Sequence, residues 1–306
     1  MSVLGFDTSN YTTSIAFFDG IHAYNCSQLL PVKQGELGLR QSDAVFHHTK
    51  SLPEISDRLF SDIDIGKINA IGVSTRPRAV NGSYMPCFMV GYSHAKLLSD
   101  ALHVPLVECS HQQGHVAAAL WSAERMDLLE RPHLAWHLSG GTTELLLVTP
   151  AGSNVNCVRI GGTTDISAGQ LIDRTGQLLN LPFPAGKHID SLSQNAQNTD
   201  VFSVKCSEME FSLSGVQNKV QQYFAVTNNS IETAAYSLRC VCKAVYRATE
   251  NALKHYPDYP VVFSGGVASN SMLRSLMAPL NPIFAQPQYS TDNALGVAIL
   301  AHRAQE

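Results

Sequence analysis

Residues 3–20, VLGFDTSNYTTSIAFFDG, place two apolar runs on either side of a short polar segment and close with a second turn at Asp19-Gly20. Apolar runs separated by short polar turns predict a strand, a tight turn and a second strand. A third strand over about residues 21–28 would complete an antiparallel meander. The chain is therefore expected to begin with a β-meander.

A second stretch, residues 134–148 (LAWHLSGGTTELLLV), follows the same plan of apolar strand, small glycine- and hydroxyl-containing turn, and apolar strand. A further strand is expected over about residues 154–160. A chance likeness of two hairpins is one interpretation, and an internal duplication is the other. Because helical and strand patterns follow each hairpin, duplication predicts an α/β protein of two lobes, each a β-meander plus helices, with a cleft between them.

The domain boundaries follow from this plan. We expect an N-terminal lobe over residues 1–104 and a C-terminal lobe over residues 105–289. A last helix, about residues 290–306, should pack back on the first lobe. Apolar spacing also predicts helices over residues 45–59 and 231–255. A length of 306 residues is sufficient for two separate cores.

The composition narrows the classes of protein. Charged residues make up only 15% of the chain, which indicates much buried or interface surface. The net charge is −4 without any lysine- or arginine-rich block, so the chain is not expected to bind nucleic acid unaided. Scattered cysteines without a Cys-x-x-Cys pair favour reduced thiols. With no secretory leader and no long apolar run, a cytoplasmic location is expected.

A candidate metal site begins at Ser110, a good helix N-cap before an alanine-rich segment. His111 and His115 are four positions apart, so both imidazoles would project from one helix face, as in sites where one helix gives two ligands to a divalent metal. Two histidines that merely lie near a helix start are the alternative. Asp292, before the last helix, is either an N-cap or a third, oxygen ligand. Such a set would leave coordination positions open for a substrate.

Three turns offer backbone N–H groups or hydroxyls to a phosphate: Ser139-Gly140-Gly141-Thr142, Ser264-Gly265-Gly266 and Asp7-Thr8-Ser9. Each alone is equally compatible with an ordinary tight turn. Together, in a duplicated α/β frame, they predict a nucleotide in the cleft.

Several acids and histidines complete the candidates. Asp173 could accept hydrogen bonds from ribose hydroxyls, or it is a solvated or paired residue of a helix. Asp165 and Asp190 are further acids to weigh. Other histidines are interpreted as structural or surface residues, namely His47, His48 and His137. No Ser-His-Asp set, Walker phosphate loop or Gly-x-Gly-x-x-Gly motif is present.

Taken in order, the motifs resemble the family of tRNA threonylcarbamoyladenosine transferases (TsaD type, formerly called glycoproteases), which has the actin-like and sugar-kinase ATPase fold. The resemblance runs through most of the chain and rests on Asp7-Thr8-Ser9 and on residues 111–115, 139–143, 165–173, 184–186, 211–215, 265–270 and 291–293. It implies an enzyme that moves a threonylcarbamoyl group from its adenylate to an adenosine next to the anticodon of tRNA.

The resemblance also implies roles for individual residues. The expected metal ligands are His111, His115 and Asp292, and the metal would be iron or zinc, with magnesium as an alternative. The turn Ser139-Gly140-Gly141 would contact phosphate, and the residues that would hold the adenosine part are Asp173, Gly186, Asp190 and Asn270. The nucleotide would be ATP or a carbamoyl adenylate.

No side chain acts as a nucleophile in that scheme, so transfer would rest on positioning and on stabilising negative charge. The implied partners are tRNA, bound through a complex, and small partner proteins of the modification machinery, with a homodimer or heterodimer as a further expectation.

The chain departs from the family's pattern near the expected phosphates. Where the family usually has Cys and two acids, this chain has Asn10-Tyr11-Thr12, and Arg76-Pro77-Arg78 replaces Gly-Pro-Gly. A family His, acid and Glu are replaced by Thr142, Ile166 and Gln170. These changes leave open a diverged paralogue, either a carbamoyl-type transferase with a different acceptor or a non-catalytic nucleotide-binding partner of a true transferase.

Overall fold

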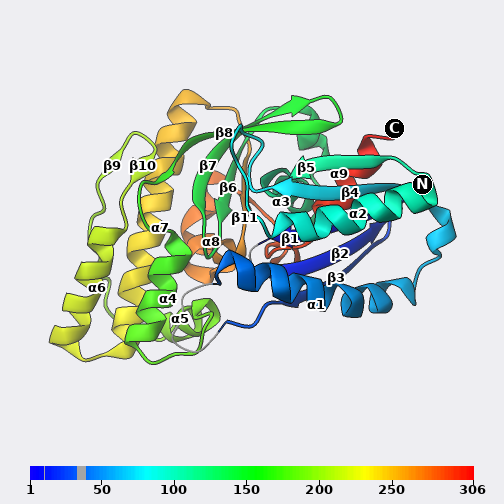
Figure 1. The fold of residues 1–306 in the computed structure, drawn as a ribbon. Coiled ribbons are helices and arrows are strands. Elements are labelled where there is room, and N and C mark those ends of the chain that lie inside the picture. Colours follow the sequence, from blue (N-terminus) through cyan, green and yellow to red (C-terminus); the bar gives the residue numbers. More distant parts are fainter. Residues whose placement is uncertain (10, 33–38) are drawn as a thin grey trace. The chain divides into compact units, whose positions relative to one another are not determined.

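The computed structural model describes residues 1–9, 11–32 and 39–306 (Figure 1). The chain divides into two compact units. Unit 1 contains Met1–Pro132, Thr149–Cys157 and Thr291–Glu306, and unit 2 contains His133–Val148 and Val158–Ser290. This division differs from the expected boundary, because residues 105–132, which include the histidine helix, belong to unit 1. The reason is that this helix packs mainly on the C-terminal helix.

Unit 1 is built on a five-stranded sheet with the order β3-β2-β1-β4-β5. Its first three strands form the expected antiparallel meander, and β4 and β5 join it in parallel. The strands are β1 (Ser2–Ser9), β2 (Thr12–Phe18), β3 (Ala23–Leu29), β4 (Ile68–Arg76) and β5 (Leu106–Ser110).

Helices cover both faces of this sheet. Because side chains alternate along a strand, Leu4 and Phe6 of β1 share a core with one pair of helices, whereas Gly5 lies under the other pair. A Cβ on Gly5 would meet the backbone of residues 294 and 298, so glycine permits this close packing. The first pair is α1 (Gln41–Phe60) and α2 (Phe88–Leu102), and the second is α3 (His111–Ser122) and α9 (Leu295–Arg303).

Unit 2 repeats this plan. In its sheet, β8-β7-β6-β11-β12 have the same sequential order as the five strands of unit 1, with β10 and β9 added beyond β8. As in unit 1, the fourth strand of the order lies parallel to the first strand of the meander. The strands are β6 (His133–Leu138), β7 (Thr143–Ala151), β8 (Asn154–Thr163), β9 (Cys206–Ser207), β10 (Glu210–Phe211), β11 (Val261–Ser264) and β12 (Ile283–Phe284). The end of β7 and the start of β8, within Thr149–Cys157, belong to unit 1. The repeat confirms the duplicated α/β plan.

The core of unit 2 lies between this sheet and its long helix. Trp136 and Phe263 are fully buried, and Trp136 Nε1 donates to Thr249 Oγ1 at 2.9 Å. The helices are α4 (Ala168–Leu178), α5 (Gly186–Ser193), α6 (Ser214–Thr227), α7 (Ser230–His255) and α8 (Ser271–Met277). Within the described residues, all seven cysteines are free thiols, and no helix combines the length and apolarity needed to cross a bilayer.

Candidate metal centre

A capping box fixes where α3 begins, as Ser110 predicts. Ser110 Oγ accepts a hydrogen bond from the Gln113 N–H (3.2 Å), and Gln113 Oε1 accepts one from the Ser110 N–H (2.8 Å). Gln113 also donates through Nε2 to the carbonyl of Val155 at 2.6 Å. His111 is therefore held at the first helical position, and His115 follows one turn later on the same face.

The helices α3 and α9 meet at two glycines. A Cβ on Gly296 would overlap the backbone carbonyl of Gly114, so this contact requires glycine. The crossing brings the segment before α9 to the histidines. There Asn293 Oδ1 accepts from the Leu295 N–H (3.1 Å), so Asn293 satisfies the start of α9. Asp292 does not cap α9 and contacts the histidines instead.

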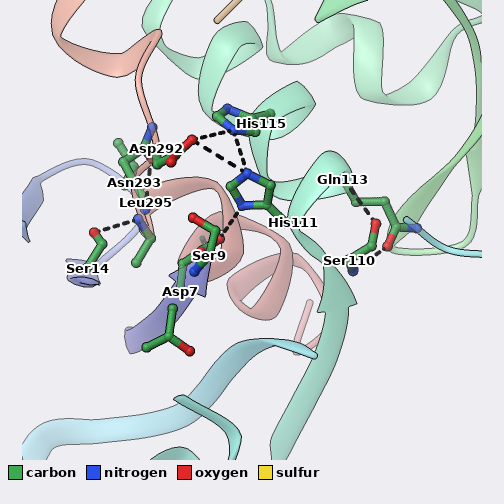
Figure 2. Close-up of polar contacts among 12 residues, drawn as sticks. Asp7, Ser9, Ser14, Ser110, His111, Gln113, His115, Asp292, Asn293 and Leu295 are labelled. Atoms are coloured by element: carbon green, nitrogen blue, oxygen red, sulfur yellow. Dashed lines mark hydrogen bonds and ion pairs between the residues drawn. The ribbon is translucent and has the colours of Figure 1, made fainter. Parts of the chain in front are cut away.

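Three ligand-type atoms converge in unit 1 (Figure 2). His115 Nε2 lies 2.9 Å from His111 Nε2 and 3.3 Å from Asp292 Oδ1. His111 Nε2 lies 3.6 Å from the same Asp292 oxygen. The His115 side chain is 3% exposed, while the Asp292 side chain is 22% exposed, so the cluster is buried on one side and reachable on another.

These separations suit a divalent cation. Two ligand atoms each about 2.1 Å from an ion lie roughly 3.0 Å apart at a right angle and roughly 3.4 Å apart in a tetrahedron. The observed 2.9, 3.3 and 3.6 Å fall around these values. Two imidazoles and one carboxylate form a donor set that zinc, iron and related metals accept, with positions left for other ligands.

A further carboxylate, that of Asp7 on β1, contacts His111 of this cluster. Asp7 Oδ2 lies 2.7 Å from His111 Nδ1, and the Asp7 side chain is only 1% exposed. Burial lowers the pKa of His111, but the charges and hydrogen bonds of Asp7 and Asp292 outweigh it and raise that pKa to about 10. Burial, with the neighbouring charge of His111, lowers the pKa of His115. The pKa of Asp292 is held well below its usual range by the two histidines despite its burial.

The cluster therefore favours positive charge, which a divalent cation would supply in place of protons. Sequence reasoning missed the contact of Asp7 with His111, because the sequence showed Asp7 only as part of a polar turn. Alternation along β1 is a signal that could have found it, since Gly5 and Asp7 share the sheet face that α3 and α9 cover.

In unit 2, the predicted phosphate turn closes the β6–β7 hairpin. Ser139 N–H donates to the Thr142 carbonyl at 2.8 Å, and Thr142 N–H donates to Ser139 Oγ at 3.1 Å. An added Cβ on Gly140 or Gly141 would meet nothing, so both Cα atoms face open space on that side, while the Gly140 carbonyl accepts from Ser167 Oγ at 2.6 Å. Directly after the neighbouring strand β11, Gly265 has φ +91° and packs against Leu138, which excludes other residues.

The four residues predicted to hold adenosine are tied together by α5, which carries Gly186 and Asp190. Ala185 N–H, just before α5, donates to Asp173 Oδ1 at 2.8 Å. Asn270 Nδ2 and Ser271 Oγ both donate to Asp190 Oδ1, at 2.8 and 2.7 Å. Burial raises the pKa of Asp173. The structure thus places these residues near one another within unit 2, and the metal cluster lies in unit 1.

Two other candidates have structural roles. Asp165 accepts hydrogen bonds from Ser212 Oγ, Ser214 Oγ and the Leu213 N–H, so it caps the start of α6. These bonds outweigh burial and hold the pKa of Asp165 well below its usual range. His48 is fully buried, with Nδ1 2.8 Å from Thr13 Oγ1. Among the departures from the family pattern, Asn10 lies outside the described residues.

Two units with the same strand order, flanked by helices, define a class of fold. Over 99% of this chain, the structure is similar to full-length HypF in its phosphate- and nucleotide-bound form, with a TM-score of 0.64, 14% identity and coverage of 46% of that chain. It is also similar to a ROK family glucokinase from Streptomyces griseus, with a TM-score of 0.55, 10% identity, and coverage of 99% of this chain and 100% of that one. The protein has the expected actin-like and sugar-kinase ATPase fold.

The sequence comparison identifies the family. Residues 33–299 match the model of TsaD, tRNA N6-adenosine threonylcarbamoyltransferase. A curated tRNA N6-adenosine threonylcarbamoyltransferase from Lactococcus lactis subsp. cremoris (strain SK11) is 30% identical over 294 residues, which is 90% of this chain and 82% of that protein. The chain belongs to the TsaD family, as its motifs indicate.

Proposed function

We propose that this chain transfers a threonylcarbamoyl group from its adenylate to the N6 amine of an adenosine next to the anticodon of tRNA. In this reaction the amine nitrogen attacks the carbamoyl carbon, the bond from that carbon to the phosphate oxygen breaks, AMP leaves and the amine loses a proton. The observation that carries the proposal is the convergence of His111, His115 and Asp292 in a chain of this family.

Two groups of residues would share the task, one for the metal and one for the nucleotide. His111, His115 and Asp292 would hold one divalent cation, for which iron and zinc suit the nitrogen-rich donor set better than magnesium. When bound, the cation supplies Lewis acidity toward an oxygen of the acyl adenylate. The Ser139–Thr142 turn would bind phosphate through its open backbone, while Asp173 and Asp190 would orient the nucleoside.

This arrangement acts by positioning and charge stabilisation. We also propose that tRNA is bound within a complex of small partner proteins, because these 306 residues have a net charge of −4 and no lysine- or arginine-rich block. A cytoplasmic location would follow from that substrate.

The test is reconstitution. The metal-loaded chain is incubated with threonine, bicarbonate, ATP, the adenylate-forming enzyme, tRNA and the partner proteins, and digested tRNA is analysed for threonylcarbamoyladenosine by mass spectrometry. We expect the product with the wild-type chain and a loss of at least 100-fold with His115→Ala. Unmodified tRNA with a folded, metal-loaded chain and active partners would refute the proposal.

One observation favours a second candidate, a carbamoyl-type transferase with another acceptor. The Gln112 N–H in the first turn of α3 donates to the Pro77 carbonyl at 3.0 Å. Arg76-Pro77-Arg78 therefore lies against the start of the histidine helix, where the family usually has Gly-Pro-Gly. Binding of a carbamoyl adenylate without tRNA modification in the same assay would favour this candidate.

A further inference from the structure

Asp7 makes two hydrogen bonds that fix its carboxylate. Oδ2 lies 2.7 Å from His111 Nδ1, and Oδ1 accepts from the Ser9 N–H at 2.9 Å. The side chain is 1% exposed, and Asp7 belongs to β1, the central strand of the sheet of unit 1. A rigid strand and a backbone donor thus hold this carboxylate against the ring of His111.

The contact decides which nitrogen of His111 carries a proton. A carboxylate without a proton only accepts hydrogen bonds, so when the ring is neutral, as in a metal ligand, the contact with such a carboxylate requires the hydrogen on His111 Nδ1. The lone pair of the neutral imidazole is then on Nε2, the atom that lies 2.9 Å from His115 Nε2 and 3.6 Å from Asp292 Oδ1. A histidine ligand held in this way has a fixed ring orientation and a more basic donor nitrogen.

We propose that Asp7 is a positioning residue of the metal centre, which orients His111 and strengthens its bond to the cation. This inference rests on the proposed function, because it assigns the cation to the same three ligands. It adds a residue from the N-terminal strand to a site whose ligands come from α3 and from the segment before α9. Asp7 acts through His111 and does not itself bind the cation.

The test measures metal affinity in the full-length chain, with Zn²⁺ and Co²⁺ as probes in competition with a chromophoric chelator. We expect Asp7→Asn to weaken binding about 10- to 100-fold. The matched control is Asp127→Asn, which changes an exposed carboxylate of unit 1 that pairs with Arg125. This control should bind both metals as the wild type does. Equal affinity of the Asp7→Asn and wild-type chains, both folded by circular dichroism, would overturn the inference.

A second pair of variants covers the case in which Asp7→Asn does not fold. Asp7→Glu and Asp7→Gln have side chains of nearly equal volume and differ in charge, so their packing cost is shared. The Gln variant should bind metal at least 10-fold more weakly than the Glu variant, and equal affinities would overturn the inference.

The proposed function is tested separately by His115→Ala. If this variant retains wild-type metal affinity, the three-ligand site itself is wrong. If it abolishes binding while Asp7→Asn binds normally, only the role of Asp7 is refuted.

Discussion

Acidification should destabilise unit 1 through one buried histidine. His48 on α1 is fully buried, and its Nδ1 lies 2.8 Å from Thr13 Oγ1. Burial lowers the pKa of His48 from 6.5 to about 4, although the charge of Asp7 partly opposes this. The folded chain therefore keeps His48 neutral at a pH where the unfolded chain already protonates it.

The direction and size of this pH effect on the free energy of unfolding follow from the linkage between proton binding and folding. Because the unfolded chain binds the proton more tightly, the stabilisation is fully present above pH 6.5 and is lost as the pH falls toward 4. The full difference corresponds to about 3 kcal/mol, at about 1.4 kcal/mol per pKa unit. Between pH 7 and pH 5 the free energy of unfolding should decrease by about 2 kcal/mol from this group alone.

The assay is urea unfolding at pH 7 and pH 5, followed by tryptophan fluorescence in a Trp136→Phe background. The remaining Trp121 lies in unit 1, edge-on to Phe18 at 6.3 Å between ring centroids, so it reports on the unit that contains His48. His48→Leu removes the titrating group. Between pH 7 and pH 5, the free energy of unfolding of this variant should therefore decrease by about 2 kcal/mol less than that of the chain with His48. Parallel pH dependences of the two chains would refute the reasoning.

Three further substitutions test other parts of the molecule. Gly296→Ala should cost about 1–3 kcal/mol in urea unfolding because its Cβ overlaps the Gly114 carbonyl, and it should also weaken Zn²⁺ binding; unchanged metal affinity would contradict the helix crossing as the basis of the site. Asp165→Ala removes the acceptor for the start of α6 and should lower the stability of unit 2 by about 1–3 kcal/mol, measured with Trp136 fluorescence, with no loss indicating a dispensable cap. Asp190→Ala releases the side chain of Asn270 and should reduce the affinity for a non-hydrolysable ATP analogue at least 5-fold by calorimetry, and wild-type affinity would exclude Asp190 from the nucleotide site.

Much of the fold could be predicted because local patterns are strong. The two hairpins stand out as apolar runs around polar turns, and the apolar spacing over 231–255 matches α7, Ser230–His255. The domain boundary could not be read in the same way. Whether α3 belongs to unit 1 or unit 2 depends on the contact of Gly114 with Gly296, and these two glycines are far apart in the chain.

The geometry of the candidate site was predictable in part. The spacing of His111 and His115 shows their shared helix face, and Ser110 shows where the helix begins. Asp292 offered two interpretations, an N-cap of the last helix or a third oxygen ligand. The sequence does not show that Asn293 pairs with the Leu295 N–H and leaves Asp292 to contact the histidines. The contact of Asp7 with His111 depends on tertiary packing. Alternation along β1 shows that Asp7 shares a sheet face with Gly5, but it does not show which side chain Asp7 meets there.

The route of the chain through the two units has a consequence for synthesis. His115 and Asp292 are 177 positions apart, and all of unit 2 lies between them. During translation the two histidines and the first sheet emerge long before the carboxylate that completes the cluster. Metal capture by all three ligands is therefore possible only after unit 2 has been made, so an occupied centre marks a chain whose translation has passed residue 292.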